Sequence, residues 1–243
     1  PHLQPEGIGM SEWSDHEFII HAFWTPRVET AQGFRSWLDL LQAETADHLG
    51  LVSWRTASPD ADWPESATDQ LALIEASIDS DDEGGRARAS GFSVHLWENP
   101  TPDQAQKSQH GSLRVTAGST YAPSRMPADR IVLNARETPL PSLPAAVKCL
   151  ESVIRRARPM VATLTDLDVY RVLRRAGWLV PAARWIWIHE SVGTFEAAGT
   201  GFETQDFEGG TLARCPDDWS AQQVSDAGMA LIMQSGVAGE VAH

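Results

Sequence analysis

Cysteine and basic residues are scarce in this chain, and each shortage excludes a class of protein. Two cysteines in 243 residues, Cys149 and Cys215, allow neither a disulfide framework nor the repeated spacing of a zinc site. Nineteen lysines and arginines stand against 33 aspartates and glutamates, a formal net charge of −14. Because nucleic-acid binding requires cations that neutralise phosphates, and anionic membranes also attract cations, we expect neither a nucleic-acid nor a membrane partner. A basic protein is the partner that such a field attracts, although plain solubility explains the charge equally well.

Long apolar runs and targeting segments are also missing. No stretch approaches membrane-spanning length, and residues 1–10 lack the charged-then-apolar order of a secretion signal, so we expect a cytoplasmic protein. We interpret residues 1–16 as an N-terminal tail, in which Met10 is a candidate native start and residues 1–9 an expression remnant. Residues 17–243 are predicted to form a single domain.

Motifs for catalysis, metals and cofactors are absent as well. Only His16 and His21 lie within five residues of each other in the sequence, no serine lies in a nucleophile elbow, and the glycine pairs lack phosphate-loop spacing. We therefore predict no catalytic residue, no metal and no cofactor. One alternative stays open, an unrecognised α+β enzyme with Asp166, Asp168 or His189 in its site. For Asp166 and Asp168 helix capping is the preferred interpretation, because the helix dipole favours carboxylates in a first turn regardless of function.

Apolar patterning predicts an α+β fold, a mostly antiparallel sheet with several amphipathic helices packed on it. Residues 18–24 are apolar on both alternating faces, as in a buried strand, and a helical pattern over 29–49 ends at Gly50. Residues 51–54 fit either a short strand or the end of a helical hairpin. Residues 58–60 are predicted to form a turn, and residues 67–78 are predicted to form a second helix.

The middle of the chain predicts an antiparallel meander. Three alternating segments, 91–97, 113–117 and 130–135, are joined by proline-punctuated connections that leave no room for crossover helices. Residues 139–144 then break the chain before a helix that buries Val147, Leu150, Val153 and Ile154.

The C-terminal third is predicted to alternate strands and helices. Strands are expected at 160–164 and 184–189, and between them a helix at 165–176 with Leu167, Tyr170 and Leu173 inward. Four glycines between Gly199 and Gly210 indicate a flexible loop. Ser220 and Gln223 form a capping-box pattern that starts a last helix, which ends at Gly236.

Two features are candidates for binding a partner. The run from Asp79 to Gly85 is predicted to be an exposed acidic loop, whose candidate contacts are Asp79, Asp81, Asp82 and Glu83. For any one of these four residues a solvated loop position is the favoured interpretation. Among ten tryptophans, Trp185 and Trp187 share one strand face, where they either pack under a helix or present a platform.

The order of these segments resembles the immunity protein 52 family. The opening strand ends in Trp24-Thr25-Pro26-Arg27 and precedes the leucine-rich helix around residues 37–41; residues 91–97, Gly118 and 129–133 resemble the central strands of that family. Gly177-Trp178-Leu179 and Gly209-Gly210-Thr211-Leu212 resemble its C-terminal third. The similarity spans most of residues 18–236.

This resemblance implies an antitoxin of a bacterial polymorphic toxin system. Family members are encoded beside toxins with restriction-endonuclease-like nuclease domains, and they protect the producing cell by binding the toxin stoichiometrically. The expected partner is thus the basic C-terminal domain of a cognate toxin. A structural adaptor module is a third hypothesis, which a large apolar surface patch would favour.

Overall fold

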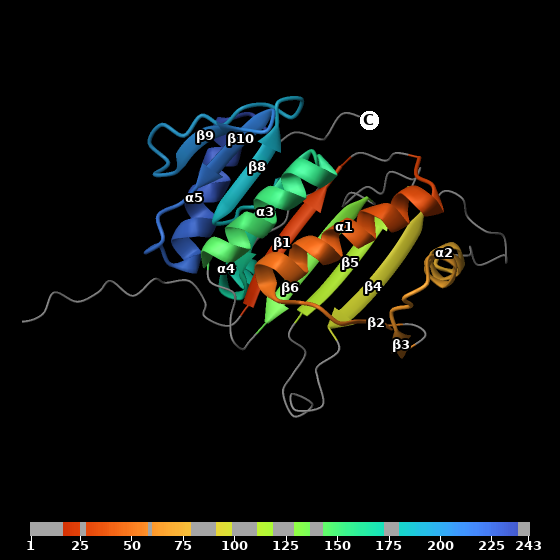
Figure 1. Ribbon diagram of the computed structural model, residues 1–243. Helices are drawn as coiled ribbons and strands as arrows, with labels where there is room; N and C mark the ends of the chain where they lie inside the picture. The colour runs from red at the N-terminus through yellow and green to blue at the C-terminus, as the bar shows by residue number, and fades with distance from the viewer. Residues whose placement is uncertain are drawn as a thin grey trace, which may run out of the picture.

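All ten strands in the described part of the chain belong to one sheet, and every neighbouring pair is antiparallel. The computed structural model describes residues 17–24, 28–57, 60–78, 91–98, 111–118, 129–136, 143–172 and 180–237. The strand order is β3-β2-β4-β5-β6-β1-β7-β8-β10-β9, so the sheet runs from β3 at one edge to β9 at the other (Figure 1). Five helices pack on it, which confirms the α+β prediction.

The strands are β1 (Glu17–Phe23), β2 (Trp54–Ala57), β3 (Asp60–Asp62), β4 (Phe92–Glu98), β5 (Gly111–Ala117), β6 (Arg130–Arg136), β7 (Val161–Asp166), β8 (Trp185–His189), β9 (Glu203–Phe207) and β10 (Gly210–Arg214). The helices are α1 (Ala31–Leu49), α2 (Ala67–Ala76), α3 (Leu143–Ala157), α4 (Leu167–Val172) and α5 (Ala221–Gln234).

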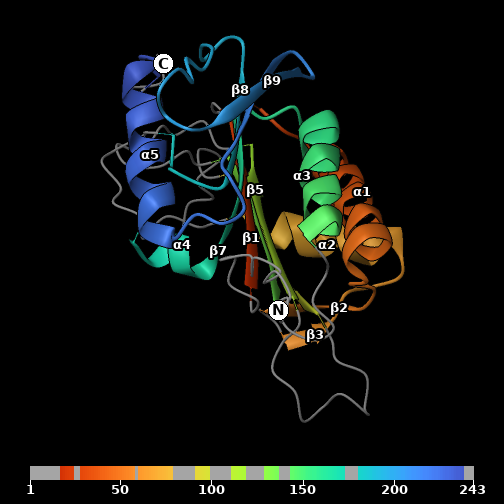
Figure 2. The same cartoon turned by 90° about the vertical axis from the view of Figure 1, so that its left-hand side faces the viewer.

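The helices divide between the two faces of the sheet. Helices α1, α2 and α3 lie on one face, which we call the front, whereas α4 and α5 lie on the back (Figure 2). The front layer buries a core between α1, α3 and strands β1, β4, β5 and β6, centred on Leu38, Leu113 and Leu150. The back layer buries a second core between α5 and strands β8 and β10, centred on Ile186 and Leu231. Each face of the sheet is thus packed against helices through its own apolar core.

Local signals place most of these elements where the sequence predicts them. Thr30 caps α1 by accepting a hydrogen bond from the Gly33 amide, and Gly50 ends the helix in the left-handed conformation at φ 70°. The capping box of α5 is present in full, with Ser220 and Gln223 each satisfying the other's backbone N–H. The meander of β4, β5 and β6 is confirmed by their register.

Three predicted boundaries are corrected. Helix α3 begins at Leu143, so Pro144 lies inside its first turn, where a missing N–H costs nothing. Of residues 51–54, only Trp54 is in a strand, because β2 begins there, and Asp60 belongs to strand β3 and not to a turn. Residues 58 and 59 lie outside the described part of the chain.

The predicted helix over residues 165–176 is also wrong in its start and its inward face. Strand β7 continues to Asp166, so α4 begins two residues later than expected and is rotated accordingly. Val169 is its fully buried residue, whereas Tyr170 is exposed. Leu173, the third residue predicted to point inward, is not among the described residues.

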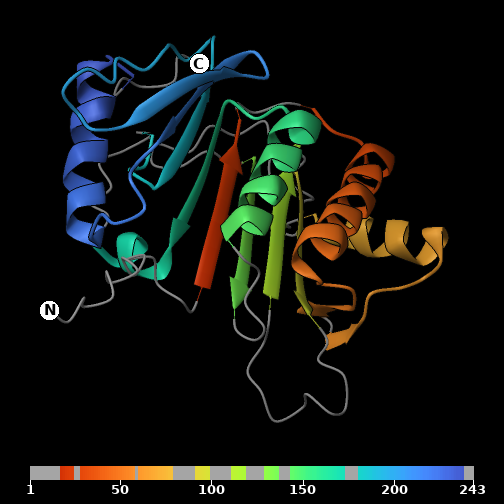
Figure 3. The same cartoon turned by 60° about the vertical axis from the view of Figure 1, so that its left-hand side comes forward.

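The predicted flexible loop between Gly199 and Gly210 contains strand β9, which is the largest correction. Four consecutive residues of β9, Glu203 to Asp206, are polar and exposed, so no apolar alternation marks the strand. An edge strand is held by backbone pairing on one side, which needs no such alternation. Figure 3 shows the β9–β10 hairpin at the end of the sheet that lies farthest from α2.

Gly210 makes this hairpin possible, and its replacement tests the packing. A Cβ at Gly210 would overlap the Ile188 carbonyl oxygen and lie 2.8 Å from the Trp187 ring. We expect Gly210→Ala to lower the free energy of unfolding by about 3 kcal/mol in urea denaturation. Gly199→Ala is the control, because nothing lies within 4 Å of its added Cβ and only the left-handed φ of 77° costs about 1 kcal/mol. Equal losses in the two variants would contradict this packing.

Candidate functional site

The β9–β10 hairpin turns through two residues with positive φ. Phe207 and Gly210 are paired across the strands, and Glu208 and Gly209 between them have φ of 46° and 74°. Two central residues with positive φ are the signature of the type I′ turn, whose twist matches that of an antiparallel pair. Glu208 therefore adopts a backbone conformation that a non-glycine residue rarely occupies.

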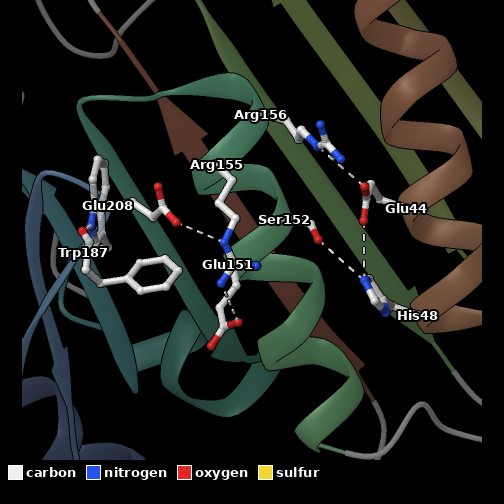
Figure 4. Close-up of polar contacts among 9 residues, drawn as sticks. Glu44, His48, Glu151, Ser152, Arg155, Arg156, Trp187 and Glu208 are labelled. Carbon is white, nitrogen blue, oxygen red and sulfur yellow. Dashed lines mark hydrogen bonds and ion pairs between the residues drawn. The ribbon is translucent and has the colours of Figure 1, made fainter.

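Contacts with α3 and β8 hold this turn in place. The Arg155 guanidinium of α3 donates from Nε to Glu208 Oε1 at 3.0 Å (Figure 4) and lies 5.1 Å from the centroid of the Phe207 ring. The indole N–H of Trp187, a residue only 1% exposed, donates to the Phe207 carbonyl oxygen at 2.8 Å. An ion pair, a stacked cation and a buried hydrogen bond thus fix the end of the hairpin on the body of the protein.

A shallow cavity opens on the front face of the hairpin. It has a volume of about 160 Å³ and is lined by Trp185, Glu203, Thr204, Gln205, Leu212 and Arg214. The register explains the grouping, because Trp185, Arg214 and Glu203 are directly opposite one another on β8, β10 and β9. The two tryptophans that the sequence leaves open take different roles: Trp187 packs in the core, and Trp185 lines the cavity.

Some polar groups in and beside this cavity have hydrogen-bond partners, and others do not. The Arg214 guanidinium lies 5.1 Å from the centroid of the Trp185 ring, and its Nη2 donates to Asp217 Oδ2 at 2.8 Å. The indole N–H of Trp185 is buried without a hydrogen-bond partner in the described part of the structure, and so is Oδ1 of Asp217. A buried donor without a partner carries a free-energy penalty that a bound acceptor would remove.

Carboxylates dominate this end of the molecule. Between residues 185 and 237 eight aspartates and glutamates stand against one arginine, Arg214. Among the described residues, neither Glu203 nor Asp206 of the exposed strand β9 forms an ion pair. We call Glu203, Asp206 and Glu208 the acidic edge. No sequence motif marks these residues as a binding surface, although the excess of carboxylates around them is a usable signal.

Cations of the sheet gather on a different surface. Alternation along the paired strands places Arg55, Arg114 and Arg130 on the back face of β2, β5 and β6. Burial, together with the charge of Arg114, lowers the pKa of His95 on the neighbouring strand β4. The chain is therefore not uniformly acidic, and its two ends differ in character.

The polar cluster between α1 and α3 resembles a catalytic triad in composition but not in geometry. His48 Nε2 lies 3.3 Å from Glu44 Oε2 and 3.4 Å from Ser152 Oγ, and Arg156 Nε lies 3.7 Å from Glu44 Oε1 (Figure 4). A nucleophilic triad needs the serine on one ring nitrogen and the carboxylate on the other. Here both oxygens approach the same nitrogen, so the cluster joins two helices and cannot relay a proton from the serine to the carboxylate.

The four predicted contacts of the acidic loop, Asp79, Asp81, Asp82 and Glu83, lie outside the described residues. Their role stays a prediction. The nearest described residues are Ile78, which follows α2, and Gly91, which precedes β4, the third strand from the β3 edge of the sheet. These two described residues lie far along the sheet from the acidic edge.

Asp166, an alternative catalytic residue, is committed to a buried ion pair. Arg184 Nε donates to Asp166 Oδ2 at 2.6 Å, and both side chains are fully buried. Asp166 Oδ1 also accepts from the Val169 amide at 2.8 Å, so the predicted capping of α4 is confirmed. Arg184 Nη1 donates to the Trp219 carbonyl oxygen at 2.8 Å. Through these contacts Asp166 and Arg184 together join β7, α4, β8 and the start of α5.

The other two alternative residues do not assemble with Asp166. Asp168 is exposed and lies 3.5 Å from Arg171 in the same helix. His189 is at the opposite end of the β7–β8 pair, because Val161 is opposite Ile188 whereas Asp166 ends β7. Five residues of strand separate the two ends, roughly 16 Å. The Nδ1 atom of His189 accepts from the Ser191 amide at 3.1 Å. These three side chains therefore form no common site.

None of the described residues form a group of three or more histidine, cysteine or carboxylate side chains that could hold a metal ion. No described helix is long and apolar enough to cross a membrane.

Comparisons with known proteins identify no relative. No family model matches the chain, and no curated protein matches it. Among solved structures, the chain is similar to the duplicated taurocyamine kinase from Schistosoma mansoni, with a TM-score of 0.25 and 8% sequence identity. That match covers 96% of this chain and 35% of the kinase chain. A similarity this low supports no inference about fold or activity, so function must be argued from the site.

The buried ion pair gives a stability prediction. We expect Arg184→Met to lower the free energy of unfolding by about 3–5 kcal/mol, because Asp166 would remain buried without its cation. Arg171→Met is the matched control, since its ion pair with Asp168 is solvent-exposed and contributes at most about 0.5 kcal/mol. Urea denaturation of both variants measures the difference. Similar losses would show that the Arg184 ion pair contributes no more than a surface pair.

The two thiols give a reactivity prediction. Burial raises the pKa of Cys149 to about 12, and the nearby Glu44 carboxylate adds to this shift. Burial also raises the pKa of Cys215 to about 11, although the Arg184 charge partly opposes it. Because the thiolate is the reactive form, we expect neither cysteine to react with a disulfide reagent at pH 8 until the protein unfolds. Rapid labelling of the folded protein would contradict this prediction.

Proposed function

We propose that this protein is an immunity protein that binds a cognate bacterial toxin and neutralises it by occupying a basic surface. One observation carries the proposal: the acidic edge is exposed, is largely free of internal ion pairs, and is fixed on the protein body through Arg155 and Trp187. A carboxylate surface that is already ordered meets a basic partner with little loss of side-chain freedom. Opposite charge also speeds the encounter of the two proteins.

A nuclease toxin fits this surface best. An enzyme that cleaves nucleic acid must present cations where it holds the phosphates, and an acidic protein competes for those cations. The resemblance of the sequence to the immunity protein 52 family agrees with such a partner, because that family is encoded beside restriction-endonuclease-like toxins. Protection of the producing cell's own nucleic acid would place the protein in the cytoplasm.

The acidic edge and the predicted acidic loop are alternative contact regions for the toxin. Strand β4, which follows the loop, is seven strand positions from β9, a distance of roughly 30 Å across the sheet. Substitution of the carboxylates in each region separately therefore assigns the contact.

The direct test is co-expression with the C-terminal domain of the protein that the neighbouring gene encodes, as the candidate toxin. We expect the wild-type protein to restore growth and to co-purify with the toxin as a stable complex. Glu203→Lys with Asp206→Lys is expected to weaken the complex on the order of tenfold or more, because favourable contacts become repulsive. The dissociation constant is measured by calorimetry at two salt concentrations.

A matched control has the same change of charge at the other end of the molecule. Glu65→Lys with Glu75→Lys alters two exposed carboxylates at α2, and we expect the affinity to change less than about threefold. Asn substitutions at Asp79, Asp81, Asp82 and Glu83 test the loop. Growth rescue without a complex would overturn the binding proposal and favour an enzymatic antidote.

A further inference from the structure

Strand β9 presents a free hydrogen-bonding edge. It is the last strand of the sheet in the described part of the chain, so one side of its backbone has no strand partner there. The flanking residues of a two-residue hairpin turn exchange both backbone hydrogen bonds, and such pairs alternate along the ladder. Phe207, Gln205 and Glu203 therefore bond to β10, whereas the N–H and C=O groups of Thr204 and Asp206 point away from it.

Most of the usual protections of a sheet edge are missing from β9. The strand contains no proline and no lysine, and its register with β10 is regular from Glu203 to Phe207 without a bulge. At the other edge, β3 has only three residues, and its Asp60 and Asp62 lie 3.1 and 3.5 Å from the Arg55 guanidinium. Carboxylates are the protection that β9 does have, and they repel only an acidic neighbour.

Both faces of a strand added to β9 would meet negative charge. Glu203 and Gln205 lie on the front face beside the cavity at Trp185, and Asp206 lies on the back face. Alternate side chains of an added strand would lie beside these groups at the strand-to-strand spacing of about 4.8 Å. Lysine and arginine are the side chains that such an edge accepts.

We infer that β9 receives an extended, lysine- and arginine-rich segment of the toxin as an additional strand of the sheet, an inference that rests on the proposed function. Backbone hydrogen bonds to Thr204 and Asp206 supply affinity, and the acidic edge selects a basic segment. Charge complementarity excludes the competing occupant, a second copy of this chain. A β9–β9 pair would bring two acidic edges together, and like charges directly opposite each other destabilise a sheet.

Thr204→Pro tests the inference, because it removes an N–H that points away from β10 and leaves the β9–β10 ladder intact. We expect it to weaken binding of the toxin C-terminal domain tenfold or more. Thr204→Val is the matched control, since it keeps the N–H and the β-branched shape, and its affinity should stay within about twofold of wild type. Circular dichroism and the melting temperature establish that both variants are folded.

A second measurement uses the unmodified protein and does not depend on the folding of a variant. Residue-resolved amide exchange by NMR compares the free protein with the complex. The Glu203 and Gln205 amides are expected to be protected in both states, and those of Thr204 and Asp206 to become protected only in the complex. Unchanged exchange at Thr204 and Asp206 in a formed complex overturns strand addition.

The possible outcomes separate this inference from the proposed function. If the wild-type protein forms no complex, the proposed function fails. If charge reversal at Glu203 and Asp206 weakens the complex while Thr204→Pro does not, the function stands and strand addition is overturned. If ultracentrifugation shows a dimer of the protein alone that Thr204→Pro dissociates, the occupant is a second copy of this chain, which also overturns the inference.

Discussion

The buried ion pair between Asp166 and Arg184 connects the end of strand β7 to the start of strand β8. It lies where β7 ends and β8 begins, and its hydrogen bonds reach the first turn of α4 and the Trp219 carbonyl oxygen just before α5. Two charges removed from water are tolerated only when their geometry and remaining hydrogen bonds are satisfied together. The orientation of β8, and through it of β10 and β9, therefore depends on this contact.

Contacts on both faces of the sheet hold β8, β10 and the edge strand β9 in this orientation. Ile186 and Leu231 pack between β8 and α5 on the back, and Arg155 joins α3 to Glu208 on the front. Trp187 adds a hydrogen bond to the hairpin from within the core. An edge strand held from both sides presents its carboxylates and its free backbone groups in one arrangement. Such preorganisation lowers the entropic cost of binding a partner.

The regular elements were predictable wherever the sequence alternates or caps. The buried strand β1, helix α1 with Gly50, the meander of β4 to β6 and the capping box of α5 all carry signals that do not depend on distant residues. The predictions of secondary structure are wrong where the apolar pattern of the sequence is weak. The sequence pattern places the start of α4 two residues too early because a strand and a helix meet at Asp166, and it indicates a loop at β9 because the residues of that strand are polar.

The sequence alone determined the α+β class, the order of most elements and the acidic balance, because short-range periodicity and composition are properties of the chain itself. Only the tertiary structure decided which carboxylates form an exposed surface and which are buried in ion pairs. Asp166 is neutralised by Arg184, eighteen positions away, and Glu203 reaches an open edge through the pairing of β9 with β10. The Asp166–Arg184 contact joins residues that are distant in the chain, and the edge position of β9 depends on the pairing of β10 with β8, so no local pattern encodes either of them.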